Sequence, residues 1–280
     1  MIERLAVIGN SHVACLKQGW DRVAEEFPSI RITFFAARAS GLLGLGYENG
    51  RLVPRNKAVG AALSATSGGK EEINLGEFDA LLIYGAGFDA AIWPDKHRFS
   101  LQAQQRALRD SIEGTTCAHI LGLLKNRYHG RIFVGHCPLH GLKGPSRPSD
   151  NTIYHQALVR IQKEILAPWD ARLIPQPEET IVLGARTDIQ YCRGAVRLSV
   201  GLANDGHGFD AEDRTHMNGD FGELWLCNFF RVVETGEFVD ESKIWKWLAF
   251  PRVRSWLQKS LGLLGRKNAY VPQYARVARR

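Results

Sequence analysis

Residues 5–12, which read Leu-Ala-Val-Ile-Gly-Asn-Ser-His, constrain the fold of this chain more than any other stretch. The apolar run is typical of a buried strand, the glycine and two small polar residues of a turn, and residues 13–20 of a helix. A strand–turn–helix unit puts its turn at the carboxyl edge of a parallel sheet, where open α/β folds bind ligands. Ser11 would then lie at the first turn of a helix, where free N–H groups and the helix dipole favour a developing negative charge. Two roles fit Ser11 at this point: a nucleophile, or a cap of the helix.

Strands and helices alternate along the rest of the chain. We expect further strands at residues 30–37, 78–84, 130–135 and 172–174, a hairpin at 47–54, and helices at 100–112, 116–125, 154–166 and 219–232. Loops are expected at 57–75, with one short strand, and at 175–210. The alternation predicts an α/β protein: a single-domain, three-layer α/β/α sandwich with a mostly parallel, flavodoxin-like sheet. We place this domain at residues 1–240 and a basic, Trp-rich extension at 241–280.

The positive charge of the chain is concentrated at its C-terminus. The net charge is +7, but residues 252–280 carry eight cations and no acid, so the preceding residues sum to −1. Tryptophans and leucines are interleaved with cations from residue 244 to 280, which suits an amphipathic segment on an anionic membrane surface. The alternative is a C-terminal helix whose tryptophans pack on the domain. Nucleic acid is not expected as a partner, because no recognition motif accompanies the charge.

Cysteine usage and the N-terminus predict a cytoplasmic protein. The five cysteines are scattered and never form a CxxC pair, which favours free thiols in a reducing compartment. We expect no secretory leader, because the first strand begins at residues 4–5. No apolar run is long enough to span a bilayer, so membrane contact would be peripheral, at the inner face.

A block near the C-terminus decides between the two roles of Ser11. Asp213 and His216 stand directly ahead of the helix expected at 219–232. The Asp-x-x-His spacing lets a carboxylate fold back on an imidazole, which fixes the histidine tautomer and stabilises its cation while it acts as general base. A strand–Gly–x–Ser–helix unit at one end of an α/β chain and Asp-x-x-His-x-Asn at the other indicate a Ser11–His216–Asp213 triad.

These two blocks resemble those of the SGNH (GDSL-type) hydrolase superfamily. Gly9-Asn10-Ser11-His12 is similar to the family's Gly-Asp-Ser block, with asparagine in place of the usual aspartate. Its serine–histidine pair looks like the variant in SGNH domains of polysaccharide O-acyltransferases. Asp213, His216 and the trailing Asn218 and Gly222 resemble the family's last block. The resemblance spans about residues 4–232 and implies an SGNH-like fold with acyl-ester chemistry.

The resemblance also implies an oxyanion hole, from which one expected donor is missing. The family's glycine after the second strand best matches Gly41, with Gly44 in reserve, and its N–H would act together with that of Ser11. The family's third block is Gly-x-Asn-Asp, whereas residues 85–89 read Gly-Ala-Gly-Phe-Asp, so Gly87 stands at the asparagine position. Loss of one such donor costs about 2.7–4 kcal/mol of transition-state stabilisation. The candidates to replace it are the Asn10 side chain, the Gly87 N–H and the loop of residues 136–140.

Other polar residues at predicted strand ends could contact a substrate. His12 is expected to cover the helix start or to line an acyl pocket, and Asn10 lies beside it. Arg38 and Asp89 are expected to be solvated loop charges, with substrate contact as the alternative.

No metal or cofactor is expected. His136 and His140 are assigned to a loop or to substrate contact, because Pro138 prevents a shared helical face and a third ligand is not evident. The glycines of residues 41–46 form neither a GxGxxG motif nor a phosphate-binding loop, so nucleotide binding is not expected.

The sequence therefore predicts a serine-dependent ester hydrolase, an esterase or deacylase that acts on a small-molecule or glycan ester. The same triad with a sugar hydroxyl as acyl acceptor would make a polysaccharide O-acyltransferase. The missing asparagine motivates a second alternative, a non-catalytic binding or assembly protein that keeps the SGNH fold.

Overall fold

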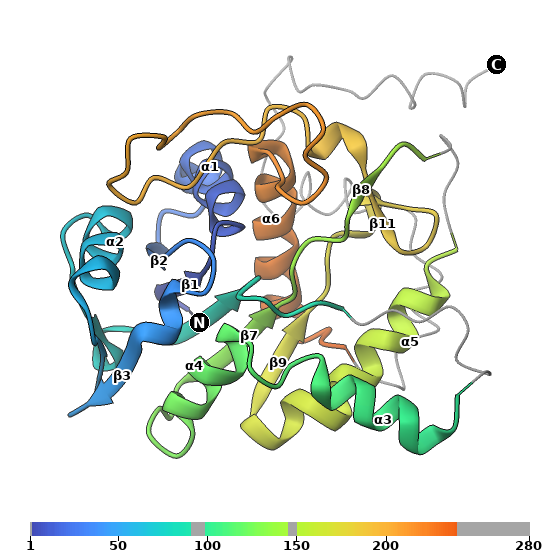
Figure 1. Cartoon of the computed structure of the whole chain (residues 1–280), viewed down its shortest axis with the longest axis horizontal. Coiled ribbons are helices and arrows are strands. Elements are labelled where there is room, and N and C mark those ends of the chain that lie inside the picture. The colour runs from blue at the N-terminus through green and yellow to red at the C-terminus, as the bar shows by residue number, and fades with distance from the viewer. Residues whose placement is uncertain (1, 91–98, 145–149, 240–280) are drawn as a thin grey trace.

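A computed structural model describes residues 2–90, 99–144 and 150–239 (Figure 1). The extension expected at 241–280, and the membrane contact expected of residues 244–280, lie outside the described residues. Both therefore stay predictions, as does the domain boundary at residue 240.

The core of the molecule is a five-stranded parallel sheet in the order β2-β1-β6-β7-β9. The strands are β1 (Arg4–Gly9), β2 (Arg31–Ala36), β6 (Ala80–Tyr84), β7 (Arg131–Gly135) and β9 (Ala171–Ile174). β1 pairs with both β2 and β6, so Gly9 is in register with Ala36 and Tyr84 at the carboxyl edge. The strand order reverses between β1 and β6, and doubly wound sheets bind their ligands outside the carboxyl ends at such a point.

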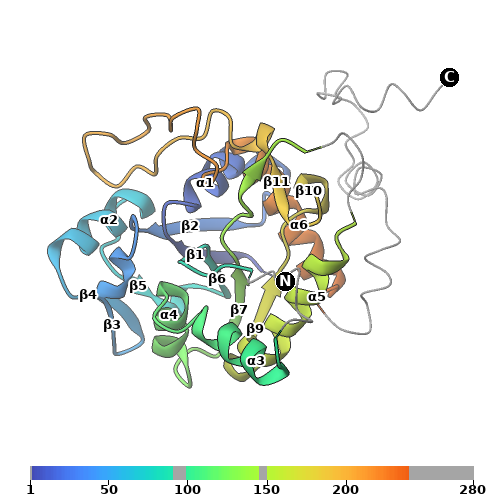
Figure 2. The same ribbon diagram turned by 45° about the vertical axis from the view of Figure 1, so that its right-hand side comes forward.

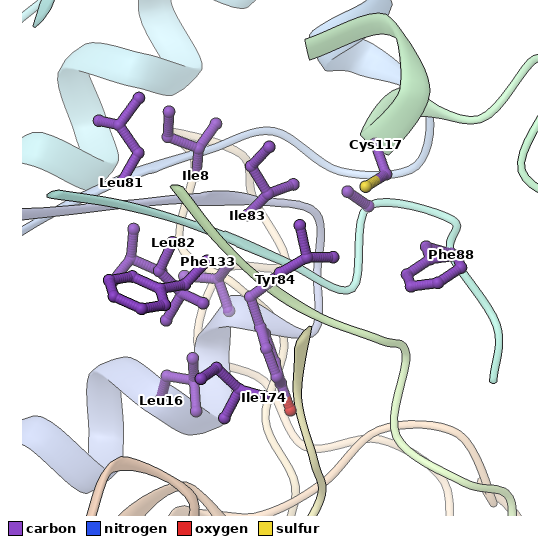
Figure 3. Close-up of a cluster of buried hydrophobic side chains, with 14 of the residues drawn as sticks. Ile8, Leu16, Leu81, Leu82, Ile83, Tyr84, Phe88, Cys117, Phe133 and Ile174 are labelled. Carbon is purple, nitrogen blue, oxygen red and sulfur yellow. The ribbon is translucent and has the colours of Figure 1, made fainter. Parts of the chain in front are cut away.

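Helices cover both faces of this sheet, which confirms the predicted α/β sandwich. Along β6, Leu82 and Tyr84 lie on the side of Leu16 from α1 (Val13–Val23), whereas Ile83 lies on the side of Cys117 from α4 (Thr116–Leu124) (Figure 3). Helix α6 (Gly219–Thr235) packs beside α1, and α2 (Lys57–Ser67) packs against β2. Helices α3 (Leu101–Asp110) and α5 (Thr152–Ile161) lie near the β9 side of the sheet (Figures 1 and 2).

Glycines allow α1 and α6 to approach closely. A Cβ atom on Gly222 of α6 would lie 1.8 Å from the Cys15 carbonyl oxygen, and one on Gly19 of α1 would lie 2.3 Å from the Glu223 nitrogen. These neighbours are backbone atoms, so a larger residue at either position requires the helices to separate. The two helices begin just after Ser11 and His216, so their contact sets the distance between these residues.

Two small sheets flank the main one. One contains β3 (Leu45–Glu48), β4 (Arg51–Pro54) and β5 (Ile73–Asn74), and the other β8 (Gly141–Leu142), β10 (Ile181–Val182) and β11 (Arg186–Asp188). The turn between β3 and β4 has positive φ at Asn49 (45°) and Gly50 (82°), as a two-residue hairpin turn requires. The predicted hairpin at 47–54 is therefore confirmed.

The loop predicted at 57–75 is wrong for most of its length. Helix α2 occupies Lys57–Ser67, begins with the Asn56 side chain accepting the Val59 N–H (3.0 Å), and ends at Gly68 with φ +79°. Its alanines and glycines give little apolar periodicity, and its burial against β2 is a tertiary contact. The helix expected at 154–166 begins at Thr152 and changes to π-helical geometry at Gln162–Leu166.

The π-helical turn protects the edge of the sheet. The Gln162 side chain accepts the Leu173 N–H (2.7 Å) and donates to the Ala171 carbonyl (3.0 Å), both on strand β9. An amide side chain thus takes the place of a further strand, which blocks edge-to-edge pairing. Among the helices of the described ranges, none is both long and apolar enough to cross a bilayer.

Candidate active site

The end of strand β1 holds Ser11 at the carboxyl edge of the sheet. A Cβ atom on Gly9 would lie 2.2 Å from the Tyr84 carbonyl oxygen, so only glycine fits where the chain leaves the strand. The Asn10 side-chain oxygen then accepts the His12 N–H (3.2 Å), and the Asn10 carbonyl accepts the Val13 N–H (3.0 Å). This tight turn directs the chain into α1 and leaves the Ser11 side chain at the edge.

The Ser11 side chain does not cap α1. The residue at the cap position is His12, and no side-chain hydrogen bond caps the helix. Ser11 Oγ instead lies 3.0 Å from His216 Nε2, across 205 residues of sequence. Of the two roles that the sequence left open for Ser11, the structure does not show the helix cap.

A local loop orients His216 through Asp213. His216 Nδ1 lies 3.0 Å from Asp213 Oδ2, and Asp213 Oδ1 accepts the backbone N–H groups of Thr215 (2.9 Å) and His216 (2.8 Å). Because a carboxylate only accepts, Nδ1 carries the proton and Nε2 is left to accept the Ser11 hydroxyl proton. Ser11, His216 and Asp213 therefore form one hydrogen-bonded chain.

The Asp213 carboxyl group is held in its charged form. Its partial burial opposes ionisation, but hydrogen bonds from the backbone and side chain of His216 and from the Thr215 N–H outweigh this effect and lower the pKa of Asp213. An ionised carboxylate beside the ring favours the protonated imidazole that a general base becomes.

Helix α6 begins directly after this loop and is anchored by Asn218. The Asn218 side-chain oxygen accepts the Phe221 N–H (3.1 Å), and its amide group donates to the carbonyls of Gln190 (3.1 Å) and Arg193 (2.9 Å). The asparagine that trails Asp-x-x-His is thus a helix cap. It also ties α6 to the segment that precedes the histidine loop.

A ring contact that the sequence did not reveal covers one side of the imidazole. The Phe209 ring is stacked on His216 with a centroid separation of 3.8 Å and an interplanar angle of 9°. The Arg197 guanidinium lies 4.5 Å from the centroid of the same Phe209 ring. The His12 ring also stacks on His216, at 5.2 Å and 30°. The two ring contacts to His216, from Phe209 and His12, restrict the orientation of the imidazole.

Phe209 is the last residue of an irregular hairpin, residues 195–209, which we call the arm. Its two sides are joined by hydrogen bonds from Phe209 N–H to the Ala195 carbonyl (2.9 Å) and from Arg197 N–H to the His207 carbonyl (2.8 Å). In both views the arm reaches above α1 toward α2 (Figures 1 and 2). The arm contacts His216 through Phe209 and is bonded to Arg38 just after β2, so it lies at the carboxyl edge of the sheet.

Arg38, at the end of β2, fastens the tip of the arm. Its guanidinium donates to the Leu198 carbonyl (2.6 and 3.1 Å), to Asn204 (2.5 Å) and to Asp205 (2.8 Å). The other Asp205 oxygen accepts three successive N–H groups, those of residues 200–202 (2.6–2.9 Å). Arg38 is therefore a half-buried structural anchor rather than the solvated charge that the sequence suggested.

The predicted oxyanion donors differ in availability. The Gly41 N–H donates to the Arg38 carbonyl (3.1 Å) at the start of the 3₁₀ turn Gly41–Gly44, and the Gly87 N–H donates to the Cys137 thiol. Both groups are thus already paired. Within the part of the chain that is described, the Ser11 N–H has no acceptor, and neither has the Asn10 side-chain amide nitrogen. Asn10 and Ser11 thus present two unpaired donors at this edge.

The glycine-rich turn after β6 packs against the serine loop through Gly85, not Gly87. A Cβ atom on Gly85 would lie 2.8 Å from Asn10 Oδ1 and 3.0 Å from His12 Cδ2, and its φ is +68°. Ala86 and Gly87 also have positive φ, 50° and 72°. Non-glycine residues seldom adopt this conformation, so the turn stores strain at the edge where the sheet opens.

His12 is kept neutral by its surroundings. Burial, followed by the nearby imidazole of His216, lowers the pKa of His12 to about 3. Its Nδ1 atom is buried and has no hydrogen-bond partner among the described residues. A neutral neighbour does not oppose the protonation of His216 by charge repulsion.

The two histidines after β7 occupy different environments. His136 is buried, with Nδ1 bonded to the Cys137 carbonyl (2.6 Å) and Nε2 to the Tyr154 hydroxyl (2.8 Å), and burial lowers its pKa. His140 is exposed. Asp89 is exposed and hydrogen-bonded to the Cys137 thiol, whose pKa is raised to about 12, first by burial and then by this carboxylate. His136 is thus part of the packed core beneath the edge.

Metal binding finds no support in residues 2–90, 99–144 and 150–239, where no three His, Cys, Asp or Glu side chains are grouped to hold an ion. All five cysteines are buried free thiols.

Comparison with known proteins adds little to this geometry. No protein-family model matches the chain, and no curated protein matches it in sequence. Among solved structures, the chain is similar to one described as a gut microbial diltiazem-metabolizing enzyme, with a TM-score of 0.38 and 11% sequence identity. The match covers 84% of this chain and 47% of that one, so the chain spans about half the length of that protein. A similarity this low says nothing about chemistry. Fold and site together define a doubly wound α/β protein with a hydrogen-bonded Ser-His-Asp group at its switch point.

Proposed function

We propose that this protein is a serine-dependent ester hydrolase in which Ser11 is the nucleophile and His216 the general base. Asp213 orients the His216 imidazole and stabilises its protonated form. The observation that carries the proposal is the continuous hydrogen-bonded chain, with 3.0 Å between Ser11 Oγ and His216 Nε2 and 3.0 Å between His216 Nδ1 and Asp213 Oδ2. The resemblance of both blocks to SGNH hydrolases supports the same assignment.

The reaction follows from these positions. Ser11 Oγ attacks the acyl carbonyl carbon while its proton passes to His216 Nε2, which gives a tetrahedral oxyanion. The C–O bond to the alcohol then breaks, and the proton on Nε2 goes to the departing alkoxide. Water attacks the acyl-serine in the same way, with His216 again taking the proton, and releases the carboxylic acid and free Ser11.

The oxyanion would be held by the serine loop itself. The unpaired Ser11 N–H at the start of α1 is the first donor, assisted by the positive end of the helix. The Asn10 amide nitrogen is the second, since its oxygen is fixed on the His12 N–H (3.2 Å) and its nitrogen is left to donate. Asn10 would thus substitute for the asparagine that residues 85–89 lack.

The test is the release of p-nitrophenol from p-nitrophenyl acetate by the full-length protein and by Ser11→Ala. We expect Ser11→Ala to lower kcat by at least about 10³-fold, because no other group takes over the attack. Ser29→Ala is the matched control, since Ser29 is exposed and precedes the amino end of β2. Labelling with a fluorophosphonate, followed by peptide mass spectrometry, should place the adduct on Ser11.

Equal rates in wild type and Ser11→Ala, with no label on Ser11, would contradict the hydrolase and favour a non-catalytic protein. The acyl acceptor is examined in the same assay by adding a sugar alcohol. Acetyl transfer to the sugar in excess of hydrolysis would instead assign an O-acyltransferase with the same triad.

A further inference from the structure

We propose that Arg197 recognises an anionic group on the substrate, a carboxylate or a phosphate, that lies one ring away from the ester bond. The inference rests on the proposed function, whose triad it extends, and it names the charge that the substrate carries.

The position of Arg197 is fixed by the arm. Its guanidinium lies 4.5 Å from the centroid of Phe209, and Phe209 lies 3.8 Å from His216. The Arg197 backbone is held on both sides, by its N–H on the His207 carbonyl (2.8 Å) and by its carbonyl on the Gly206 N–H (3.2 Å). A guanidinium laid on an aromatic face keeps its N–H donors directed outward, in the plane of the group.

Arg38 and Arg197 both interact with the arm, but they use their hydrogen-bond donors differently. The Arg38 guanidinium donates hydrogen bonds to the Leu198 carbonyl, Asn204 and Asp205, all of which belong to the arm. Within the described ranges, the Arg197 guanidinium forms neither a hydrogen bond nor an ion pair. Its guanidinium lies over the Phe209 ring, and its N–H donors are available to a bidentate acceptor.

The carboxylates nearest in sequence do not neutralise Arg197. Asp205 is engaged by Arg38 and three backbone N–H groups, and Asp213 by His216 and Thr215. Asp210 and Glu212 are exposed, and among the described residues neither makes an ion pair with Arg197. A half-buried cation with free donors, on the ring that stacks on His216, is the arrangement expected of an anion-recognition residue.

The reach of this site suits a compact substrate. An ester held at Ser11 Oγ is adjacent to the imidazole, and Arg197 is separated from that imidazole by the thickness of Phe209. Because the Phe209 centroid lies 3.8 Å from that of His216 and 4.5 Å from the Arg197 guanidinium, we test substrates whose negative group lies across a six-membered ring from the ester oxygen. Sugar acids, sugar phosphates and substituted aromatic esters all have that form.

The experiment compares three acetate esters: 4-acetoxybenzoate, its neutral methyl ester, and 4-acetoxyphenyl phosphate. Each is hydrolysed by wild type and by Arg197→Met, which keeps an apolar cover on Phe209 but removes the charge. We expect Arg197→Met to lower kcat/KM for the carboxylate or the phosphate ester by roughly 10- to 100-fold and to change the neutral ester less than twofold. The ester that suffers the larger loss identifies the anion.

Two further variants separate recognition from other effects. Arg197→Lys keeps the positive charge but not the paired N–H donors of the guanidinium. It should therefore recover only part of the kcat/KM for the anionic ester that Arg197→Met loses. Arg31→Gln removes an exposed arginine at the amino end of β2 and should leave all three esters unchanged. Equal losses on all three esters in Arg197→Met would overturn the proposal, because Arg197 would then only hold Phe209 in place. Unchanged rates on all three would overturn it as well. In either case, Ser11-dependent hydrolysis of the neutral ester would still stand, whereas failure of the proposed function removes that hydrolysis.

Discussion

The two loops that meet at the candidate site are built in different ways. The serine loop is short and local: strand β1 ends at Gly9, Asn10 closes a turn on His12, and α1 begins at Val13. The histidine loop is local only around Asp213, and its approach depends on the arm. The arm is held by Arg38, which is 167 residues away from Asp205 in sequence.

Ser11 and His216 are therefore positioned by different kinds of contact. The position of Ser11 follows from a strand, a glycine and a helix that adjoin it in the chain. The orientation of His216 follows partly from Asp213, three residues away, and partly from Phe209, whose arm is fastened to another strand. Substitutions in the serine loop and at Asp213 should therefore act on chemistry directly, and those at the arm through geometry.

The largest effect is expected from Asp213→Asn. An amide at this position can present its own N–H to Nδ1 and favour the wrong histidine tautomer, so kcat should fall by about 10²–10⁴-fold. Hydrolysis of p-nitrophenyl acetate measures the loss. Asp210→Asn, at an exposed carboxylate in the same loop, is the control and should stay within twofold. A rate for Asp213→Asn within threefold of wild type would show that the carboxylate is not needed.

The next largest effect is expected from Gly222→Ala, which disrupts the packing of α6 against α1. These two helices follow the histidine loop and the serine loop. The added methyl group would lie 1.8 Å from the Cys15 carbonyl oxygen, so α1 and α6 must separate. We expect a loss of about 1–3 kcal/mol in the free energy of unfolding, measured by urea denaturation. Gly122→Ala in α4 is the matched control, because nothing lies within 4 Å of its Cβ position. That variant should be neutral or more stable by about 0.5–1 kcal/mol. Equal stability of the two variants would contradict the close approach of the helices.

Arg38→Met tests whether the arm supports His216. Loss of the anchor frees the tip of the arm and loosens Phe209, and we expect kcat/KM for a neutral ester to fall by roughly tenfold, about 1.4 kcal/mol. Asp205→Asn should give a similar loss, and the double variant should lose little more than either single variant, since the two residues act as one unit. Arg51→Met, which breaks the exposed pair with Glu72, should have no effect on rate. Fully additive losses in the double variant would mean that Arg38 and Asp205 act separately.

The last prediction concerns His12→Gln and the pH dependence of stability. The pKa of His12 is about 3 in the folded protein, against an ordinary value of 6.5. Between these two pH values the unfolded chain binds a proton that the folded protein does not, so stability is full above about pH 6.5 and falls as the pH drops toward 3. Glutamine cannot be protonated, so His12→Gln should lose less stability than wild type between pH 7.5 and about pH 4.5 in urea denaturation.

Part of this acid sensitivity should remain in His12→Gln, because burial also lowers the pKa of His136. His129→Gln, at an exposed histidine, should follow the wild-type curve. Parallel curves for wild type and His12→Gln would show that His12 is not neutralised by folding.

Elements with strong local patterns could be predicted from the sequence. The strands at the sheet centre are apolar runs bounded by glycine or charge, and the Asn49-Gly50 turn carries its own hairpin signal. The helix at residues 57–67 could not be predicted in this way, because its small side chains lack periodicity and its stability comes from contact with β2. A cap signal was present in Asn56, since its side chain accepts the Val59 N–H.

The candidate site likewise has features that follow from local sequence and features that depend on tertiary contacts. By itself the sequence determined that Ser11 lies in the turn between a strand and a helix and that Asp213 precedes His216 by one turn of loop, because such relations involve neighbouring residues. Only the tertiary structure decided that the Gly41 and Gly87 N–H groups are paired, that Arg38 anchors the arm, and that Phe209 stacks on His216. These are contacts between segments that the chain keeps far apart. Their formation depends on how the helices and the arm close over the sheet, and no local pattern of residues encodes that closure.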